Sequence, residues 1–275
     1  MTFCRYLAPM VFGAILVGPA NTAGAGASEE CADVVAGRQI LVCTLVIENP
    51  SATQAQRAQA HDNRGIAYAR DGQYDRALAD FDDAIHLAPD NAIAYTNRGN
   101  LYLGAAKYDR AVADYSEALR LDPVYVPAFV GRGVAYLRLG RSQEALFDLD
   151  VAVRLAPTDA KILDNRGTAY FSLGQTDHAI RDYSEAIRLD PHSASAYYNR
   201  GNALARVDRL DEALQNLSEA IRLSPNNASA HYNSGLVYVM KGDRARAIEE
   251  MVEALRLDPA HAGARRGLTL LHGDD

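Results

Sequence analysis

Asparagine recurs in this sequence at positions that keep a constant phase. The side-chain amide carries a donor and an acceptor in the geometry of a peptide bond. A row of such amides can hydrogen-bond the backbone of an extended peptide with little regard to its sequence. Consecutive asparagines lie 34 residues apart, except that Gly131 stands between the second and the third. The five asparagines are Asn63, Asn97, Asn165, Asn199 and Asn233.

Arginine and acidic residues keep the same phase. The arginines are Arg64, Arg98, Arg132, Arg166 and Arg200, followed by Ser234, and the acidic series is Asp80, Asp114, Asp148, Asp182, Asn216 and Glu250. Both series recur every 34 residues, and we call each 34-residue stretch a copy. Pairing each acidic residue with the arginine of the next copy matches charge with charge and neutral Asn216 with neutral Ser234. Pairing within a copy mismatches two of the six. We therefore predict bidentate salt bridges between copies: Asp80–Arg98, Asp114–Arg132, Asp148–Arg166 and Asp182–Arg200. The alternative is that these arginines are solvated.

Residues that could support catalysis or bind a metal form no known motif. The sequence contains no HExxH, glycine-rich phosphate loop, nucleophile elbow or CxxC. His61 and His231 fall where other copies carry large packing residues, so core filling is expected of them. We expect no enzyme activity, no metal and no cofactor.

Residues 1–27 are typical of a secretory signal peptide. Arg5 precedes an apolar run at Leu7–Val17, and small residues suited to cleavage follow it. The run is shorter than the roughly 20 residues that a membrane-spanning helix needs. We predict cleavage after Ala27 or Ala25 and export, in a bacterium to the periplasm. The alternative is retention of this segment as an anchor.

Two cysteines, Cys31 and Cys43, remain after that cleavage. An even pair in an exported chain predicts a disulfide. This disulfide would tie the short segment that contains Cys31 to the apolar stretch Arg38–Glu48. It would stabilise the fold by about 3 kcal/mol. The alternative is two buried thiols.

The elements that position these side chains follow from a repeat. Glycine recurs every 34 residues from Gly65 to Gly235, two alanine columns keep step with it, and prolines from Pro89 to Pro259 close each copy. A fixed period of this length predicts a solenoid. Each copy contains two apolar stretches of helical period, usually with a glycine between them, so each predicts a helix–turn–helix and the chain is all-α.

The columns resemble the tetratricopeptide repeat (TPR) family over Ala58–His261. Positions are counted within each 34-residue repeat, the first of which begins at Ala58. The resemblance rests on small residues at positions 8, 20 and 27, tyrosine at 11, an aromatic residue at 24 and proline at 32. It implies a right-handed superhelical solenoid whose first helices line a concave groove. The predicted organisation is a signal peptide at 1–27, a degenerate half-repeat at 28–57, repeats at 58–91, 92–125, 126–159, 160–193, 194–227 and 228–261, and a capping helix at 262–275.

The resemblance places position 6, the asparagine column, in that groove. Neighbouring positions favour repeats 4–6 as the binding end, with the further candidates Lys161, Phe171, Tyr198, Asn202, Arg206 and Tyr232. The clamp by which some family members hold chaperone C-termini needs lysine at position 5 and arginine at position 6, and neither occurs.

The formal net charge of −7 disfavours nucleic acids and anionic membranes as partners. The family resemblance implies binding of a protein or an extended peptide. The sequence therefore predicts a non-catalytic scaffold or assembly factor of the cell envelope. The alternatives are a self-associating scaffold and a cell-wall or carbohydrate-associated accessory factor.

Overall fold

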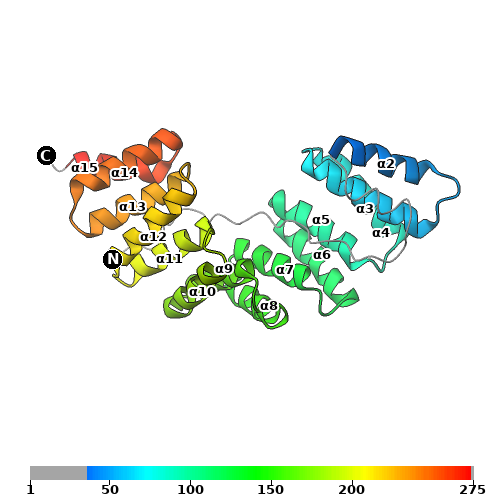
Figure 1. The fold of residues 1–275 in the computed structure, drawn as a ribbon, viewed down its shortest axis with the longest axis horizontal. Helices are drawn as coiled ribbons and strands as arrows, with labels where there is room; N and C mark the ends of the chain where they lie inside the picture. Colours follow the sequence, from blue (N-terminus) through cyan, green and yellow to red (C-terminus); the bar gives the residue numbers. More distant parts are fainter. Residues whose placement is uncertain (1–35, 274–275) are drawn as a thin grey trace. The chain divides into compact units, whose positions relative to one another are not determined.

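The computed structural model describes residues 36–273, and this part of the chain is almost entirely α-helical, without strands (Figure 1). The all-α repeat fold predicted from the sequence is confirmed. The signal peptide and Cys31 lie outside the described residues, so the predictions about cleavage and the Cys31–Cys43 disulfide stay predictions.

The described helices fall into two compact units. Residues 36–155 contain α2 (Ala36–Glu48), α3 (Gln54–Arg70), α4 (Tyr74–Leu87), α5 (Ala92–Gly104), α6 (Tyr108–Leu121), α7 (Val126–Arg138) and α8 (Ser142–Leu155). Residues 156–273 contain α9 (Ala160–Ser172), α10 (Thr176–Leu189), α11 (Ala194–Arg206), α12 (Leu210–Leu223), α13 (Ala228–Met240), α14 (Arg244–Leu257) and α15 (Ala262–His272).

Each 34-residue copy folds as a hairpin of two helices, here called helix A and helix B. Helix A often begins at a side-chain cap, as where the Asn91 side chain accepts a hydrogen bond from the backbone of Ile93. The turn into helix B needs one residue in the left-handed region. Glycine takes this conformation in four copies, and Ala106 and Asp208 adopt it in the other two.

In residues 36–155 the aromatic column packs across the glycines of helix A. Phe81 and Tyr115 are buried, and a Cβ on Gly99 would lie 2.9 Å from the Tyr115 ring. The glycine column therefore marks the close approach of helices A and B. At the N-terminal end α2 packs on α3, with Cys43 fully buried in a cluster with Val46 and Ala60.

In residues 156–273 the same hairpins share an apolar core. Tyr198, Leu204 and Leu217 lie in one buried cluster. The last helix, α15, packs through Ala264 beside Met251 and leaves its arginines exposed. It thus covers an apolar surface that the sixth copy would otherwise present to solvent.

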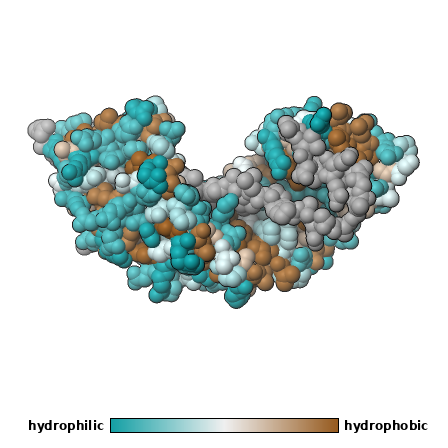
Figure 2. Space-filling view, viewed as in Figure 1, coloured by the Kyte–Doolittle hydropathy of each residue, from teal (hydrophilic) through white to brown (hydrophobic). Residues whose placement is uncertain are grey.

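The surface of the described residues mixes polar and apolar groups. An apolar patch lies on the N-terminal unit where α2 runs (Figure 2). Leu41 and Leu45, one turn apart on that helix, are each 59% exposed. None of the described helices combines the length and the apolar character that crossing a membrane requires.

Candidate functional site

The arginine column pairs within each copy, and the predicted pairing between copies is wrong. Arg98 donates from Nε and Nη2 to the two carboxylate oxygens of Asp114, at 2.9 and 2.7 Å. The same pattern joins Arg64 to Asp80, Arg132 to Asp148 and Arg166 to Asp182. The correction has a physical reason: helices A and B of one hairpin lie closest together, so the carboxylate 16 residues ahead meets the guanidinium edge-on. The predicted partners Asp80–Arg98, Asp114–Arg132, Asp148–Arg166 and Asp182–Arg200 are therefore replaced by pairs inside one hairpin.

The remaining guanidinium nitrogen reaches the helix B before it. Arg98 Nη1 donates to Asp82 at 2.7 Å, and Arg132 Nη1 donates to Ser116 at 3.1 Å. Arg64 and Arg200 make the same contact with Thr44 and Ser184. One arginine thus joins three helices and sets the stacking register. Sequence reasoning missed this partner column, although a hydroxyl or carboxylate stands two residues after each of the four aspartates: Asp82, Ser116, Asp150 and Ser184.

Charge explains how Arg200 differs from the other arginines. Its Nε donates to the neutral Asn216 at 2.8 Å. Hydrogen bonding to Asp148 raises the pKa of Arg132, whereas burial lowers the pKa of Arg200. The fifth copy therefore holds a partly buried cation whose helix B partner is the neutral Asn216.

The asparagine column closes a seam between adjacent A helices. Asn97 is buried and donates from Nδ2 to both carboxylate oxygens of Asp62, at 3.0 and 3.1 Å. Asn199 donates to Asp164 at 2.9 Å, and Asn233 donates to the Tyr198 hydroxyl and to Asn202. Each bond runs from one copy to the copy before it.

A peptide-binding ladder of these amides is therefore wrong for Asn97, Asn199 and Asn233. Their amide nitrogens already donate to the copy before them, and these residues are at most 4% exposed. Asn63 is also buried, and Asn165 is half-buried. The small residues of the repeat bring neighbouring A helices so close that position 6 lies between them. Gly131 interrupts the column because a Cβ there would lie 2.4 Å from the Tyr115 ring.

The groove residues predicted in repeats 4–6 are mostly packing residues. Phe171, Tyr198, Asn202 and Tyr232 are buried, and Lys161 and Arg206 are exposed. The first four cannot present a surface to a partner, which corrects their predicted role. Arg206 stacks on the Phe171 ring, 4.9 Å from its centroid, and donates to the Phe171 carbonyl at 3.2 Å.

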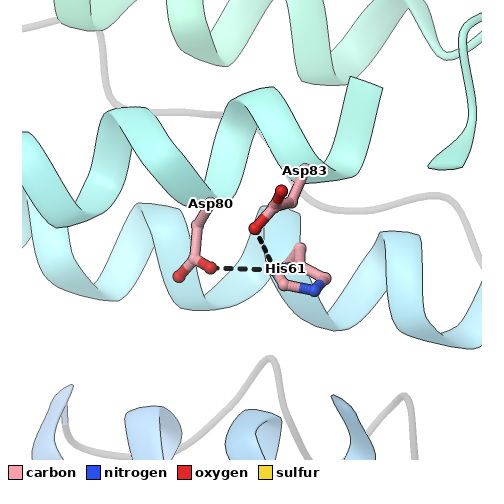
Figure 3. A group of neighbouring side chains, drawn as sticks. All are labelled: His61, Asp80 and Asp83. Carbon is pink, nitrogen blue, oxygen red and sulfur yellow. Dashed lines mark hydrogen bonds and ion pairs between the residues drawn. The ribbon is translucent and has the colours of Figure 1, made fainter. Parts of the chain in front are cut away.

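A cluster of His61, Asp80 and Asp83 has the donor atoms of a metal site (Figure 3). His61 Nδ1 lies 2.8 Å from Asp80 Oδ1 and 3.7 Å from Asp83 Oδ2. Burial alone would raise the pKa of Asp80, but hydrogen bonds from Arg64 and His61 outweigh it and lower that pKa. The Arg64 guanidinium already neutralises Asp80 and repels a second cation. A like pair, His231 with Glu250 at 2.7 Å, occurs in the sixth copy, where Ser234 replaces the arginine. These histidines are hydrogen-bonding partners and not only core filling.

A cavity lies in the N-terminal unit, between α3 and α5 near the turns that follow them. It measures about 510 Å³, within the roughly 300–1,000 Å³ typical of ligand sites. Ile66, Ala69, Leu101 and Phe81 are among the apolar residues that line it. Smaller cavities of about 440 and 300 Å³ lie beside loops in residues 156–273.

Polar and charged groups surround this α3–α5 pocket. Arg70 and Lys107, one from each repeat, line it together with Asp75, and none of the three makes an ion pair within residues 36–273. Tyr74, also a lining residue, is 62% exposed. Asn100 accepts from the Tyr115 hydroxyl at 2.7 Å through Oδ1, which leaves its amide nitrogen as a donor. Sequence reasoning missed this site because its cause is the small size of Ala69 and Gly104.

Hairpins of equal length, stacked through their A helices, define a helical repeat protein. Models of the tetratricopeptide repeat match residues 58–91, 96–160 and 228–261, and a TPR repeat model matches 167–208 and 208–242. The chain belongs to the tetratricopeptide repeat family. No curated protein matches it at a significant level.

Solved structures support the same family. YrrB, described as a TPR protein with an unusual peptide-binding site, is 30% identical; the likeness covers 69% of this chain and 97% of YrrB, with a TM-score of 0.53. A structure of MamA is 27% identical over 60% of this chain and 96% of MamA, with a TM-score of 0.52. PilF of Pseudomonas aeruginosa is 18% identical over 79% of this chain and 99% of its own, with a TM-score of 0.68, and shows the fold alone.

Proposed function

We propose that this chain is a protein-binding scaffold of the cell envelope that holds a peptide segment of its partner at the α3–α5 pocket. The observation that supports this most is the pocket itself: it is preformed, apolar inside and bordered by charged groups without partners. Such a site binds without paying to order a loop first. The peptide-binding site named for YrrB agrees with this class of ligand.

Rigidity of the wall around the pocket supports the same function. Arg64 and Arg98 fix their hairpins to the helix before them, and Asn97 joins α5 to α3. These bonds hold both sides of the pocket in one register. A partner segment therefore meets a fixed surface, and the loss of entropy on binding falls mainly on the segment.

Site-specific photo-cross-linking tests this function. A photo-reactive amino acid replaces Tyr74 at the pocket, and the matched control replaces Phe147, which is 67% exposed on α8. We expect one envelope protein to be captured from Tyr74 in the expressing cell and not from Phe147. Equal capture from both positions, or none from a folded Tyr74 variant, would contradict the proposal.

A second candidate function is self-association through α2. Leu41 and Leu45 form an exposed apolar strip on that helix. Large exposed apolar patches mark sites of protein–protein interaction. A second copy of the chain is the occupant that this candidate names.

A further inference from the structure

We call the packing of one A helix on the A helix of the next repeat a step of the solenoid. Comparison of the steps shows the cause of the α3–α5 pocket. In the step from α9 to α11, Phe171 stands at position 12 of the first repeat and Arg206 at position 13 of the next. The ring is buried with Ala179 and Tyr183, and the guanidinium covers it. Side chains of this chain thus fill the equivalent space there.

In the step from α3 to α5 the same two positions hold Ala69 and Gly104. Leu101 replaces Ala203 at position 10 and restores part of the lost volume, but the cavity remains. The other steps within a unit carry at least one large side chain at these positions, with Leu103 and Arg138 in one and Ala205 and Met240 in the other, where Met240 is 53% exposed. The pocket is therefore the space of an aromatic ring and the cation over it.

We propose that the α3–α5 pocket receives an aromatic side chain, Phe or Tyr, of a partner peptide, with an acidic residue beside it in that peptide. This inference rests on the proposed function and names the chemistry of its ligand. The ring would lie between Ile66 and Leu101 where Phe171 lies in the other step. Aromatic anchors seated in such pockets carry much of the energy of an interface.

The charges around the pocket favour an acidic residue next to the aromatic residue of the peptide. Arg70 and Lys107 outnumber Asp75, and none of them has an ion-pair partner in the described part of the chain. A carboxylate next to the aromatic residue would meet both cations. The Asn100 amide nitrogen remains as a donor for a backbone carbonyl of the peptide or for a tyrosine hydroxyl.

The test titrates the whole chain with three capped pentapeptides, Ser-Glu-Xaa-Glu-Ser, in which Xaa is Phe, Leu or Ala. Methyl and amide NMR shifts measure affinities down to the millimolar range. We expect the Phe peptide to bind at least tenfold more tightly than the other two, with shifts at Ile66 and Leu101. Equal affinity for the Phe and Leu peptides, or no binding of the Phe peptide, overturns the proposal.

Two double variants act in opposite directions. Ala69→Phe with Gly104→Arg copies the filled step, and a Cβ on Gly104 would meet nothing within 4 Å; we expect at least a tenfold loss of affinity for the Phe peptide. Phe171→Ala with Arg206→Gly opens the other step, and we expect a second site for the same peptide. Unchanged binding by the filled variant overturns the proposal, and this variant decides the matter if the opened one fails to fold.

The protein captured at Tyr74 separates this inference from the proposed function. If that protein binds the wild type and the filled variant equally, the aromatic pocket is wrong and the scaffold function stands. If no protein is captured while the Phe peptide binds with the expected preference, the scaffold function is wrong and the pocket chemistry stands.

Discussion

At the residue scale, burial and charge decide which side chains hold the stack and which can meet a partner. Asn97, Asn199, Asn233 and Tyr198 form hydrogen bonds between neighbouring repeats. Arg64, Arg98, Arg132 and Arg200 each join three helices. The α3–α5 pocket remains for binding, because Ala69 and Gly104 are small. Two predictions at this scale test the hydrogen bonds and ion pairs that hold the stack.

The first concerns the unmatched cation of the fifth repeat. Asn216→Asp gives Arg200 the anionic partner that Arg166 has in Asp182, and it should raise the free energy of unfolding by about 1 kcal/mol, since charged hydrogen bonds exceed neutral ones. The converse change, Asp182→Asn, should lower it by about 1–3 kcal/mol. Urea unfolding of both variants measures this. A loss of stability in Asn216→Asp would show that this arginine is better held by an amide.

The second concerns the buried carboxylate of Asp62. Burial raises its pKa from 3.8 to about 6, against the opposing hydrogen bond from Asn97. The native state therefore retains a proton that the unfolded chain loses, and this group's contribution to stability falls as the pH rises from about 4 to about 6. Asp62→Asn should remove that fall and gain up to about 3 kcal/mol at pH 7 relative to pH 4.

Urea unfolding at a series of pH values measures the difference between Asp62→Asn and the wild type. The exposed Asp90→Asn is the matched control and should show no such difference. The same gain at pH 4 as at pH 7 would mean that the effect has another origin than the titration of Asp62.

At the scale of elements, the hairpins could be predicted from the sequence and their contacts only in part. Helical periods, the turn glycines and the prolines are local signals, so the order of helices A and B follows directly. The partner of Arg98 could not be derived, because Asp80 and Asp114 differ by two residues in distance along the chain and only the packing separates them. The asparagine seam escaped prediction because burial of position 6 depends on how closely two A helices approach.

The exposed strip of α2 carries the prediction at this scale. If the chain self-associates through this helix, Leu41→Glu with Leu45→Glu should yield monomers where the wild type sediments as a dimer, because a charge in an apolar contact is strongly unfavourable. Phe147→Glu on α8 is the control and should leave the state unchanged. A wild type that stays monomeric at high micromolar concentration would exclude this interface.

At the scale of the whole molecule, the proposed scaffold binds its partner after export. Cleavage of the signal peptide predicted at residues 1–27 would leave a mature chain that begins at Ser28 or Gly26. N-terminal sequencing of the protein from a fractionated bacterial host checks this. An intact residue 1–27 segment in the membrane fraction would indicate an anchored scaffold instead.

The central claim is that a partner segment binds the α3–α5 pocket and not the asparagine seam. Methyl NMR of the chain mixed with the segment of the protein captured at Tyr74 tests it most directly. We expect shift changes centred on Ile66, Ala69 and Leu101. Changes centred on helices α11 and α13, with these three methyl groups unmoved, would contradict it.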